Sequence, residues 1–394
     1  VICILICSIF FASAQNEGNI WYFGINAGLD FNSGVPVVLT NGQLVTHEGC
    51  ATIADNNGDL LFYTDGMLVY NKNHTIMPNG TDLLGHMSST QSAVIIKKPG
   101  SMTIYYIFTV DGNSGLGGGL HYSEVDMTLD GGLGDINTTK NIMLIPATCE
   151  KVTVVTHQNG SDFWVVSVLE NSNTYNSFLI TASSGVNAIP VVSNIGAVHN
   201  FTGGYLRGSP DGSKIASVFC WGINPIELYD FNNSTGVLSN LVSLNTGHDY
   251  YGLEFSPDAN LLYTTIESGG GVYQLNLLAG STVDIVNSEI LLGTTINNGG
   301  SIQLAPDGKI YAASWTSTVL GVINDPNIVG IGCNFNPMGP DLTLGGTHLG
   351  SSMGGLPTFY SSIFNSTNNF NFNNPCYGDS AIFNFSNTSA DSVL

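Results

Sequence analysis

The sequence predicts an all-β protein, specifically a seven-bladed β-propeller. The main observation is a short stretch that occurs three times and reads as an alternating strand, a Pro-Asp-Gly type turn and a second strand. The three copies cover 205–216, 252–263 and 301–312. Their turns reach Gly212, Ala259 and Gly308, which are 47 and 49 residues apart. A hairpin repeated at a period in the forties is typical of propeller blades.

Three more diverged hairpins precede these copies. Each joins two strands rich in apolar and β-branched residues through a turn of Asn, Gly, Pro or Ser. They cover 50–64, 91–110 and 152–169, and the strands outside them are expected at 67–71, 121–127 and 175–180. The corresponding outer strands of the later blades are expected at 226–231, 271–277 and 320–323. This organisation gives six complete blades and one split blade.

The split blade is expected to form from the two ends of the propeller. Strands at 19–24 and 27–32 have no earlier partner in the sequence, and 354–360 offers a lone strand near the other end. We expect the N-terminal strands to pair with this C-terminal strand, because such closure removes exposed strand edges.

The segments outside the ring suggest an exported, multidomain protein. Residues 1–14 read as an N-terminally incomplete signal peptide, with an apolar run at 2–11 and the cleavage motif Ala12-Ser13-Ala14. The propeller is assigned to 15–364 and an Asn-rich linker to 365–375. Residues 376–394 alternate like the start of an immunoglobulin-like, PKD-like β-domain that is truncated here. The apolar run at 2–11 is too short to span a bilayer, and no other run approaches the roughly 18 residues of a membrane helix. We therefore expect a secreted or outer-surface location without membrane insertion.

Composition narrows the classes of partner. The chain has 8 Lys and Arg against 29 Asp and Glu, a formal charge of −21, and no basic patch. Nucleic acid is therefore excluded as a partner. Five cysteines follow the signal, and their spacing fits neither a compact disulfide framework nor a zinc motif. Most are expected to be buried free thiols, and their pairing stays open. They are Cys50, Cys149, Cys220, Cys333 and Cys376.

One column of the aligned blades is a candidate binding site. The residue before each inner strand is polar and should face the mouth of the central channel, where these loops converge. The column contains Glu48, Thr90, Glu150, Thr202, Asp249 and Asn298, with Ser352 in the split blade. Such a ring could hold a cation through oxygen ligands or hydrogen-bond a sugar. The alternative is a set of ordinary polar loops around a water-filled channel.

A second column places Arg207, Glu254 and Gln303 at equivalent positions of the inner strands. Buried charges are costly unless paired, so an ion pair between Arg207 and Glu254 of adjacent blades is expected. A catalytic role for either residue is the alternative. The chain contains no H-x-x-H or H-E-x-x-H motif, and we expect no catalytic residues.

Several early motifs resemble a known group of proteins. They are Asn-Ile-Trp-Tyr-Phe-Gly at 19–24 and the stretches at 27–31, 48–53, 61–66 and 77–80. They look like the start of large secreted Bacteroidota proteins with an N-terminal propeller. The resemblance implies PKD-like domains after the propeller and a gliding-motility-associated C-terminal domain, the type B signal of type IX secretion. It supplies no catalytic residues.

These observations predict a non-catalytic, exported binding or adhesion module at the bacterial cell surface, with a glycan or protein ligand. Tyr250, Tyr251 and Trp315 are the candidate exposed aromatic contacts. One alternative is a metal-assisted propeller hydrolase or lactonase acting at the channel mouth, and another is a purely structural spacer. We expect no cofactor, with calcium at the polar ring as the alternative.

Overall fold

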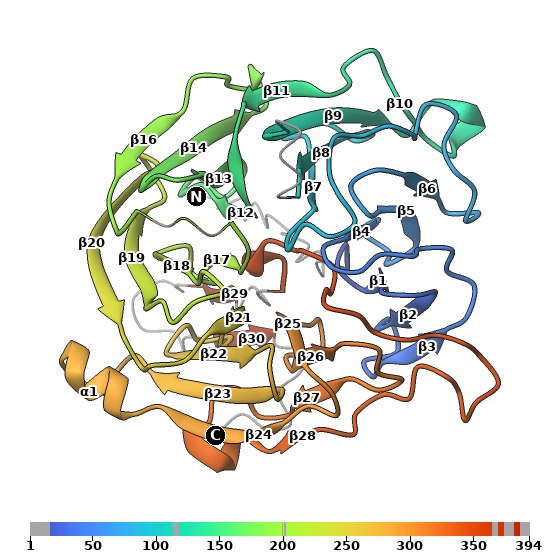
Figure 1. Cartoon of the computed structure of the whole chain (residues 1–394). Helices are drawn as coiled ribbons and strands as arrows, with labels where there is room; N and C mark the ends of the chain where they lie inside the picture. Colours follow the sequence, from blue (N-terminus) through green and yellow to red (C-terminus); the bar gives the residue numbers. More distant parts are fainter. Residues whose placement is uncertain are drawn as a thin grey trace, which may run out of the picture.

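The computed structural model contains seven antiparallel sheets arranged as blades in a ring (Figure 1), so the predicted seven-bladed propeller is confirmed. The structure describes residues 16–112, 118–198, 200 and 202–364, together with the backbone of strands at 369–373 and 382–386. The predicted signal peptide lies outside these residues. Nothing in the described part of the chain is a helix long and apolar enough to cross a membrane.

The blades are numbered in chain order. Blade 1 contains β1 (Ile20–Phe23), β2 (Ala27–Asp30) and β3 (Val37–Leu39), and blade 2 contains β4 (Ala51–Ala54), β5 (Leu60–Thr64) and β6 (Val69–Asn71). Blade 3 contains β7 (Ala93–Lys97), β8 (Ile104–Val110), β9 (Leu120–Asp126), β10 (Asp135–Ile136) and β11 (Ile142–Ile145). Blade 4 contains β12 (Thr148–Thr156), β13 (Phe163–Leu169), β14 (Thr174–Thr181), β15 (Gly185–Val186) and β16 (Val191–Asn194).

The blades that carry the three clear repeats are four-stranded. Blade 5 contains β17 (Leu206–Gly208), β18 (Lys214–Ser217), β19 (Ile226–Asn232) and β20 (Val237–Leu244). Blade 6 contains β21 (Tyr250–Phe255), β22 (Leu261–Ile266), β23 (Gly271–Asn276) and β24 (Ile290–Thr294). Blade 7 contains β25 (Gly299–Leu304), β26 (Ile310–Ser314), β27 (Gly321–Ile323) and β28 (Phe335–Asn336). Short helical turns lie outside the strands: η1 (Asp130–Gly132), α1 (Thr282–Asn287), η2 (Gly330–Cys333) and η3 (Ser361–Phe364).

The predicted Pro-Asp-Gly turns connect the first and second strands of their blades. In blade 5 the Asp211 carboxylate accepts hydrogen bonds from the Ser209 hydroxyl at 2.5 Å and the Ser213 N–H at 3.1 Å, and Gly212 takes a φ of 71°. In blade 6 the equivalent Ala259 adopts a φ of 59°, a left-handed conformation that a glycine would take more easily. These turns all lie at one end of the ring, which we call the turn face. The opposite end, where inner strands begin and second strands finish, is the mouth face.

The predicted closure of the ring is wrong in its details. Strand β1 pairs with β2 and not with 354–360, and the two ends meet in a single bridge between Ile25 and Ser351. The other side of β1 is taken by blade 2, because the Tyr22 N–H donates to the Thr52 hydroxyl at 3.1 Å. Pro357 has no N–H for a strand ladder, which also disfavours a regular strand at 354–360.

Residues 351–364 instead run through the channel from the mouth face to the turn face, and we call them the channel segment. The Gly354 N–H donates to the His47 carbonyl at 2.7 Å near the mouth, and the Thr358 N–H donates to the Cys50 carbonyl at 2.8 Å further in. At the turn face the Ser361 hydroxyl donates to the Gly208 carbonyl at 2.8 Å. The channel is therefore occupied by the chain itself, contrary to the water-filled alternative.

The predicted pair of Arg207 and Glu254 is confirmed inside the channel. Arg207 Nε lies 3.4 Å from Glu254 Oε2, and both side chains are buried. The guanidinium also donates to Gln303 Oε1 at 3.0 Å and to the Phe359 carbonyl of the channel segment at 3.1 Å. These contacts join the inner strands of blades 5, 6 and 7 to the channel segment, which indicates a structural role.

Apolar side chains fill the spaces between adjacent blades. Cys50, Cys149, Cys220 and Cys333 are buried free thiols, as expected, and Cys376 lies outside the described residues. The short helix α1 was not predicted, although Ser281 and Asp284 form a capping box at its start. Beyond the ring, β29 (Asn369–Asn373) pairs with β30 (Ile382–Ser386), and the domain boundaries 15–364, 365–375 and 376–394 stay predictions.

Candidate functional site

The predicted polar ring lies at the mouth face, but its members divide into two groups. Four of the six residues are buried in hydrogen-bonded positions behind the mouth: Glu48, Thr90, Glu150 and Thr202. The other two, Asp249 and Asn298, are exposed. Asp249 lies directly before the inner strand of blade 6, and Asn298 lies directly before the inner strand of blade 7. Ser352 of the split blade is also buried, and its hydroxyl donates to the Ser314 carbonyl at 2.6 Å.

Glu150 binds its neighbours in the ring directly. Its Oε2 accepts hydrogen bonds from the N–H and the hydroxyl of Thr90, both at 3.2 Å, and its Oε1 accepts from the Thr202 hydroxyl at 3.2 Å. The next residue, Lys151, is fully buried, and its ammonium donates to the Val218 carbonyl at 2.5 Å. Burial lowers the pKa of Lys151 to about 8. This part of the ring holds blades 3, 4 and 5 together.

Glu48 is the second buried carboxylate of the mouth. The Tyr251 hydroxyl donates to its Oε1 at 2.6 Å and the Ser88 hydroxyl to its Oε2 at 2.9 Å. Burial raises the pKa of Glu48 to about 7, against the lowering effect of these two hydrogen bonds, and the negative charges of Glu150 and Glu267 raise it further. The carboxylates of the mouth therefore interact electrostatically with one another.

The carboxylates among the predicted oxygen ligands do not form a metal site by themselves. Across the residues that the structure describes, no group of three or more His, Cys, Asp or Glu side chains is arranged to hold a metal ion. The reason is local: the ring carboxylates Glu48 and Glu150 are already hydrogen-bonded to hydroxyls, and Asp249 accepts the Gly222 N–H at 3.1 Å.

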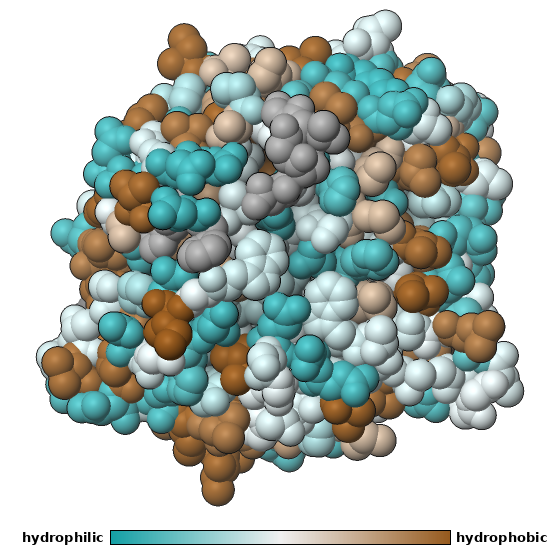
Figure 2. Space-filling view, in the orientation of Figure 1, coloured by the Kyte–Doolittle hydropathy of each residue, from teal (hydrophilic) through white to brown (hydrophobic). Residues whose placement is uncertain are grey.

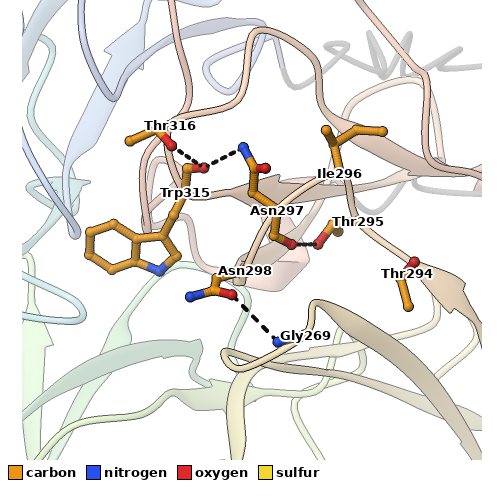
Figure 3. A pocket seen from close by; sticks show the side chains of 8 residues that line it. All are labelled: Gly269, Thr294, Thr295, Ile296, Asn297, Asn298, Trp315 and Thr316. Atoms are coloured by element: carbon orange, nitrogen blue, oxygen red, sulfur yellow. Dashed lines mark hydrogen bonds between the residues drawn. The ribbon is translucent and has the colours of Figure 1, made fainter.

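Two adjacent hollows open at the mouth beside this buried cluster, and both include Asn298. The first has a volume of about 510 Å³ and is lined by Gly269, Thr294, Thr295, Ile296, Asn297, Asn298, Trp315 and Thr316 (Figure 3). The second has a volume of about 450 Å³ and is lined by Cys220, Trp221, Asp249, Ile266, Glu267, Ser268 and Asn298. We call the two together the mouth pocket. Seen along the ring axis, the centre of the molecular surface is mainly hydrophilic or intermediate, and the most hydrophobic residues lie mainly toward the edge (Figure 2).

Trp315 forms one wall of the mouth pocket. Its indole and the Asn298 amide project to the same side of the loop, whereas Ile296 points away from them (Figure 3). The Trp315 carbonyl accepts hydrogen bonds from Asn297 Nδ2 at 3.0 Å and from the Thr316 hydroxyl at 2.8 Å, which fix the loop. The indole packs on the channel segment so closely that a Cβ on Gly354 would lie 2.6 Å from it. Its N–H is buried and has no hydrogen-bond partner among the described residues.

Trp221 lines the second hollow and is held in an unusual backbone conformation. Its φ is 66°, and the side chain is 45% exposed. A bulky residue at positive φ is strained, typically by about 1–3 kcal/mol, and such strain is concentrated at functional sites. The ring lies against the backbone of Gly203, where a Cβ would approach it to 2.8 Å. The fold therefore keeps a large aromatic side chain at the mouth although neither burial nor a relaxed backbone favours it.

Glu267 and Asp249 supply negative charge to the Trp221 side of the pocket. Burial raises the pKa of Glu267, a hydrogen bond from Trp221 opposes this effect, and the charge of Asp249 adds to it. Both carboxylates line the second hollow.

Of the three aromatic residues that were predicted to be exposed, only Trp315 is partly exposed. Tyr250 and Tyr251 are buried, because they begin strand β21 and their rings turn into the protein. Trp221 and Glu267 were missed, since only the residues before inner strands were aligned. Second strands run antiparallel to inner strands and end at the same mouth face. An alignment of the residues after the second strands would have found both.

Comparisons with known proteins establish the fold and no more. No protein-family model matches the chain, and no curated protein is similar to it in sequence. A putative 6-phosphogluconolactonase from Bacteroides uniformis is 13% identical, with a TM-score of 0.50 over 77% of this chain and 92% of that one. A protein from Lactobacillus plantarum is 11% identical, with a TM-score of 0.50 over 82% of this chain and 97% of that one. At such low identity these similarities support the propeller architecture, and they transfer no activity.

Proposed function

We propose that this propeller is a non-catalytic binding module whose ligand occupies the mouth pocket. The observation that carries the proposal is the pair of tryptophans, Trp221 from blade 5 and Trp315 from blade 7, each of which lines one of two hollows that share Asn298. Aromatic side chains supply large contact areas in binding sites, and a few polar groups then fix the ligand's orientation. The channel behind the pocket is filled by the channel segment, so a ligand would bind at the mouth and not pass through.

The polar groups of the pocket favour binding over chemistry. Among the lining residues Cys220 carries a thiol, but burial raises the pKa of this thiol well above its usual value. A thiol that stays protonated is a poor nucleophile. The Asp249 carboxylate accepts the Gly222 N–H, and hydrogen bonding from Trp221 engages Glu267. These engagements support a recognition surface with fixed acceptors.

We also propose that the module is exported and displayed at the bacterial cell surface, where it binds a glycan or a protein. The apolar run at 2–11 with its cleavage motif and the resemblance to secreted Bacteroidota proteins support export. At the turn face, Phe364 lies against Gly18, so these two residues at the ends of the propeller are on the same side of the ring. The PKD-like domains implied by the resemblance would therefore attach there, and the mouth pocket would point away from them.

The proposal can be tested by screening glycan and peptide libraries for an increase in the thermal unfolding midpoint of the full chain. A ligand at 100 times its dissociation constant stabilises the folded state by about 2.7 kcal/mol. The increase should disappear in a Trp221→Ala/Trp315→Ala variant and persist in Met102→Ala, a change of an 84% exposed side chain at the turn face. A ligand whose effect survives the double tryptophan change would contradict the proposed site. Conversion of a bound ligand into product, detected by mass spectrometry, would contradict the non-catalytic role.

A further inference from the structure

The Trp221 half of the mouth pocket is lined by two carboxylates and by no basic side chain. Asp249 and Glu267 line this half, and no Lys or Arg lines either hollow. All eight Lys and Arg of the sequence belong to the described residues. Lys97, Lys98, Lys214 and Lys309 lie at the hairpin ends of the turn face, Lys72 and Lys140 follow outer strands, and Lys151 and Arg207 are buried. The exposed cations of the chain therefore lie away from the mouth, where Asp249 and Glu267 line the pocket.

Trp221 adds a second feature that favours a positive charge. An exposed tryptophan face attracts a cation through its π-electrons, and tryptophan is the strongest of the aromatic side chains in this respect. Here the ring borders the same hollow as the two carboxylates. Aromatic rings combined with carboxylates form the usual environment for ammonium groups that carry organic substituents.

The Trp315 half differs in its chemistry. Its polar lining consists of hydroxyls, amides and backbone groups without a charged side chain, including Thr295, Asn297 and Thr316. The Asn298 side-chain oxygen accepts the Gly269 N–H at 3.5 Å, which leaves the amide NH2 group of Asn298 to donate into this hollow. A neutral group that carries a hydrogen-bond acceptor, such as a carbonyl oxygen, would pair with this donor.

We propose that the ligand of the mouth pocket carries an organic cation, an ammonium or guanidinium group, that binds against Trp221 beside Asp249 and Glu267. A neutral part of the ligand with a carbonyl-type acceptor extends across Asn298 toward Trp315. This inference rests on the proposed function and specifies its ligand class. The cation can belong to a free amine or to a lysine or arginine side chain of a polypeptide, and both share the chemistry that the pocket recognises.

A metal ion and a neutral sugar fit these observations less well. A metal ion needs several ligands about 2.0–2.6 Å from one point, and no group of three or more His, Cys, Asp or Glu side chains is so arranged in the part of the chain that the structure describes. A neutral sugar would suit the Trp315 half but would leave the carboxylates of the other half without a counter-charge. An organic cation with a polar neutral part satisfies both halves.

Calorimetric titration of the full chain with four small probes tests this inference. The probes are N-acetyl-lysine methylamide, N-acetyl-arginine methylamide, the uncharged analogue N-acetyl-norleucine methylamide, and tetramethylammonium chloride. The two basic amides should bind at least about tenfold more tightly than the norleucine amide, and added salt should weaken them because it screens exposed charges. If tetramethylammonium binds as tightly as the basic amides, the natural ligand is a free organic cation. If tetramethylammonium binds more weakly than the basic amides, the cation belongs to a polypeptide.

Variants locate the effect. Trp221→Ala should weaken the basic probes by about tenfold, the upper range for a partly desolvated cation–π contact. Glu267→Gln and Asp249→Asn should each weaken them several-fold while leaving the norleucine amide unchanged. The matched control is Asp59→Asn, which removes one exposed negative charge at the turn face and should change nothing. Thermal unfolding of each variant establishes that it is folded.

The inference and the proposed function fail in different ways. If the lysine and norleucine amides bind with equal affinity, or if Glu267→Gln binds the basic probes with unchanged affinity, the inference of a cationic ligand is refuted. The mouth pocket then remains the proposed site for neutral ligands. If only a neutral sugar binds, and its binding is lost in Trp221→Ala/Trp315→Ala, the cationic ligand is likewise refuted and the mouth pocket remains the site. Basic probes that bind with unchanged affinity to the double tryptophan variant overturn both.

Discussion

Replacement of Arg207 by methionine provides a quantitative test of how the channel is built. Arg207 is 1% exposed and lies where three inner strands meet the channel segment. Its Nε is 3.4 Å from Glu254 Oε2, its Nη2 is 3.0 Å from Gln303 Oε1, and its Nη1 is 3.1 Å from the Phe359 carbonyl. Methionine keeps much of the side-chain length and removes the charge, so the change isolates the polar contacts.

The expected cost is about 3–5 kcal/mol of unfolding free energy at pH 7, because the change leaves a buried carboxylate without its partner. Burial already raises the pKa of Glu254, and Arg207 counteracts part of that rise. Without Arg207 the folded-state pKa of Glu254 rises further above its unfolded value. A carboxyl group with such a raised pKa loses stabilisation as the pH rises through that value. The deficit of the variant should therefore be small near pH 4 and largest at neutral pH.

The assay is urea-induced unfolding of wild type and variant between pH 4 and 8. Adding Glu254→Gln to Arg207→Met should recover part of the loss at pH 7, which a double-mutant cycle quantifies. Lys214→Ala is the control, since its bridge to Asp230 lies on the surface and is worth at most about 1 kcal/mol. A loss below about 1 kcal/mol for Arg207→Met, or a deficit independent of pH, would refute this account of the channel.

Three further changes test the mouth and the channel segment. The pKa of Glu48 is raised to about 7, and each pKa unit is worth about 1.4 kcal/mol, so the wild-type protein should lose up to about 3 kcal/mol of stability between pH 4.5 and 8. Glu48→Gln should abolish this decline. Parallel pH dependences of the two proteins in urea unfolding would contradict this. Gly355→Ala should cost about 3 kcal/mol of unfolding free energy, since its Cβ would lie 1.9 Å from the Glu48 carbonyl oxygen. Gly346 has open space around it, so Gly346→Ala should cost about 1 kcal/mol from its φ of 85° alone. Equal costs in the same assay would argue against the channel segment. Trp221→Gly should be about 1 kcal/mol more stable than Trp221→Ala, because glycine accepts the left-handed backbone; the reverse order would show that this backbone is not strained.

The sequence was sufficient for the blades because their signals are local. Each hairpin consists of an alternating strand, a turn and a second strand, and Asp211 shows how one turn residue binds neighbouring backbone groups. The pairing of Arg207 with Glu254 was also predictable, since equivalent positions of adjacent blades face each other and buried charges require partners.

The channel segment and the mouth pocket could not be predicted in the same way. The contacts of the channel segment are mostly between backbone groups far apart in the chain, such as the Thr358 N–H and the Cys50 carbonyl, and backbone groups leave no residue-specific signal. The exposure of Trp221 depends on a left-handed backbone conformation that its residue type disfavours. Tyr251 was misplaced because a position beside a loop was taken as exposed, although its hydroxyl reaches the buried Glu48.

The most direct test of the central claim is a nitrogen–proton NMR spectrum of the full chain with labelled tryptophan. The chain has 4 tryptophans, so four indole signals are expected, and single Trp→Phe variants assign them. Trp21 and Trp164 are buried and donate to the Gly18 and Asn233 carbonyls, away from the mouth. During titration with the strongest ligand from the thermal screen, the signals of Trp221 and Trp315 should move saturably while those of Trp21 and Trp164 stay in place. Saturable binding that leaves Trp221 and Trp315 unmoved would contradict the mouth pocket as the site.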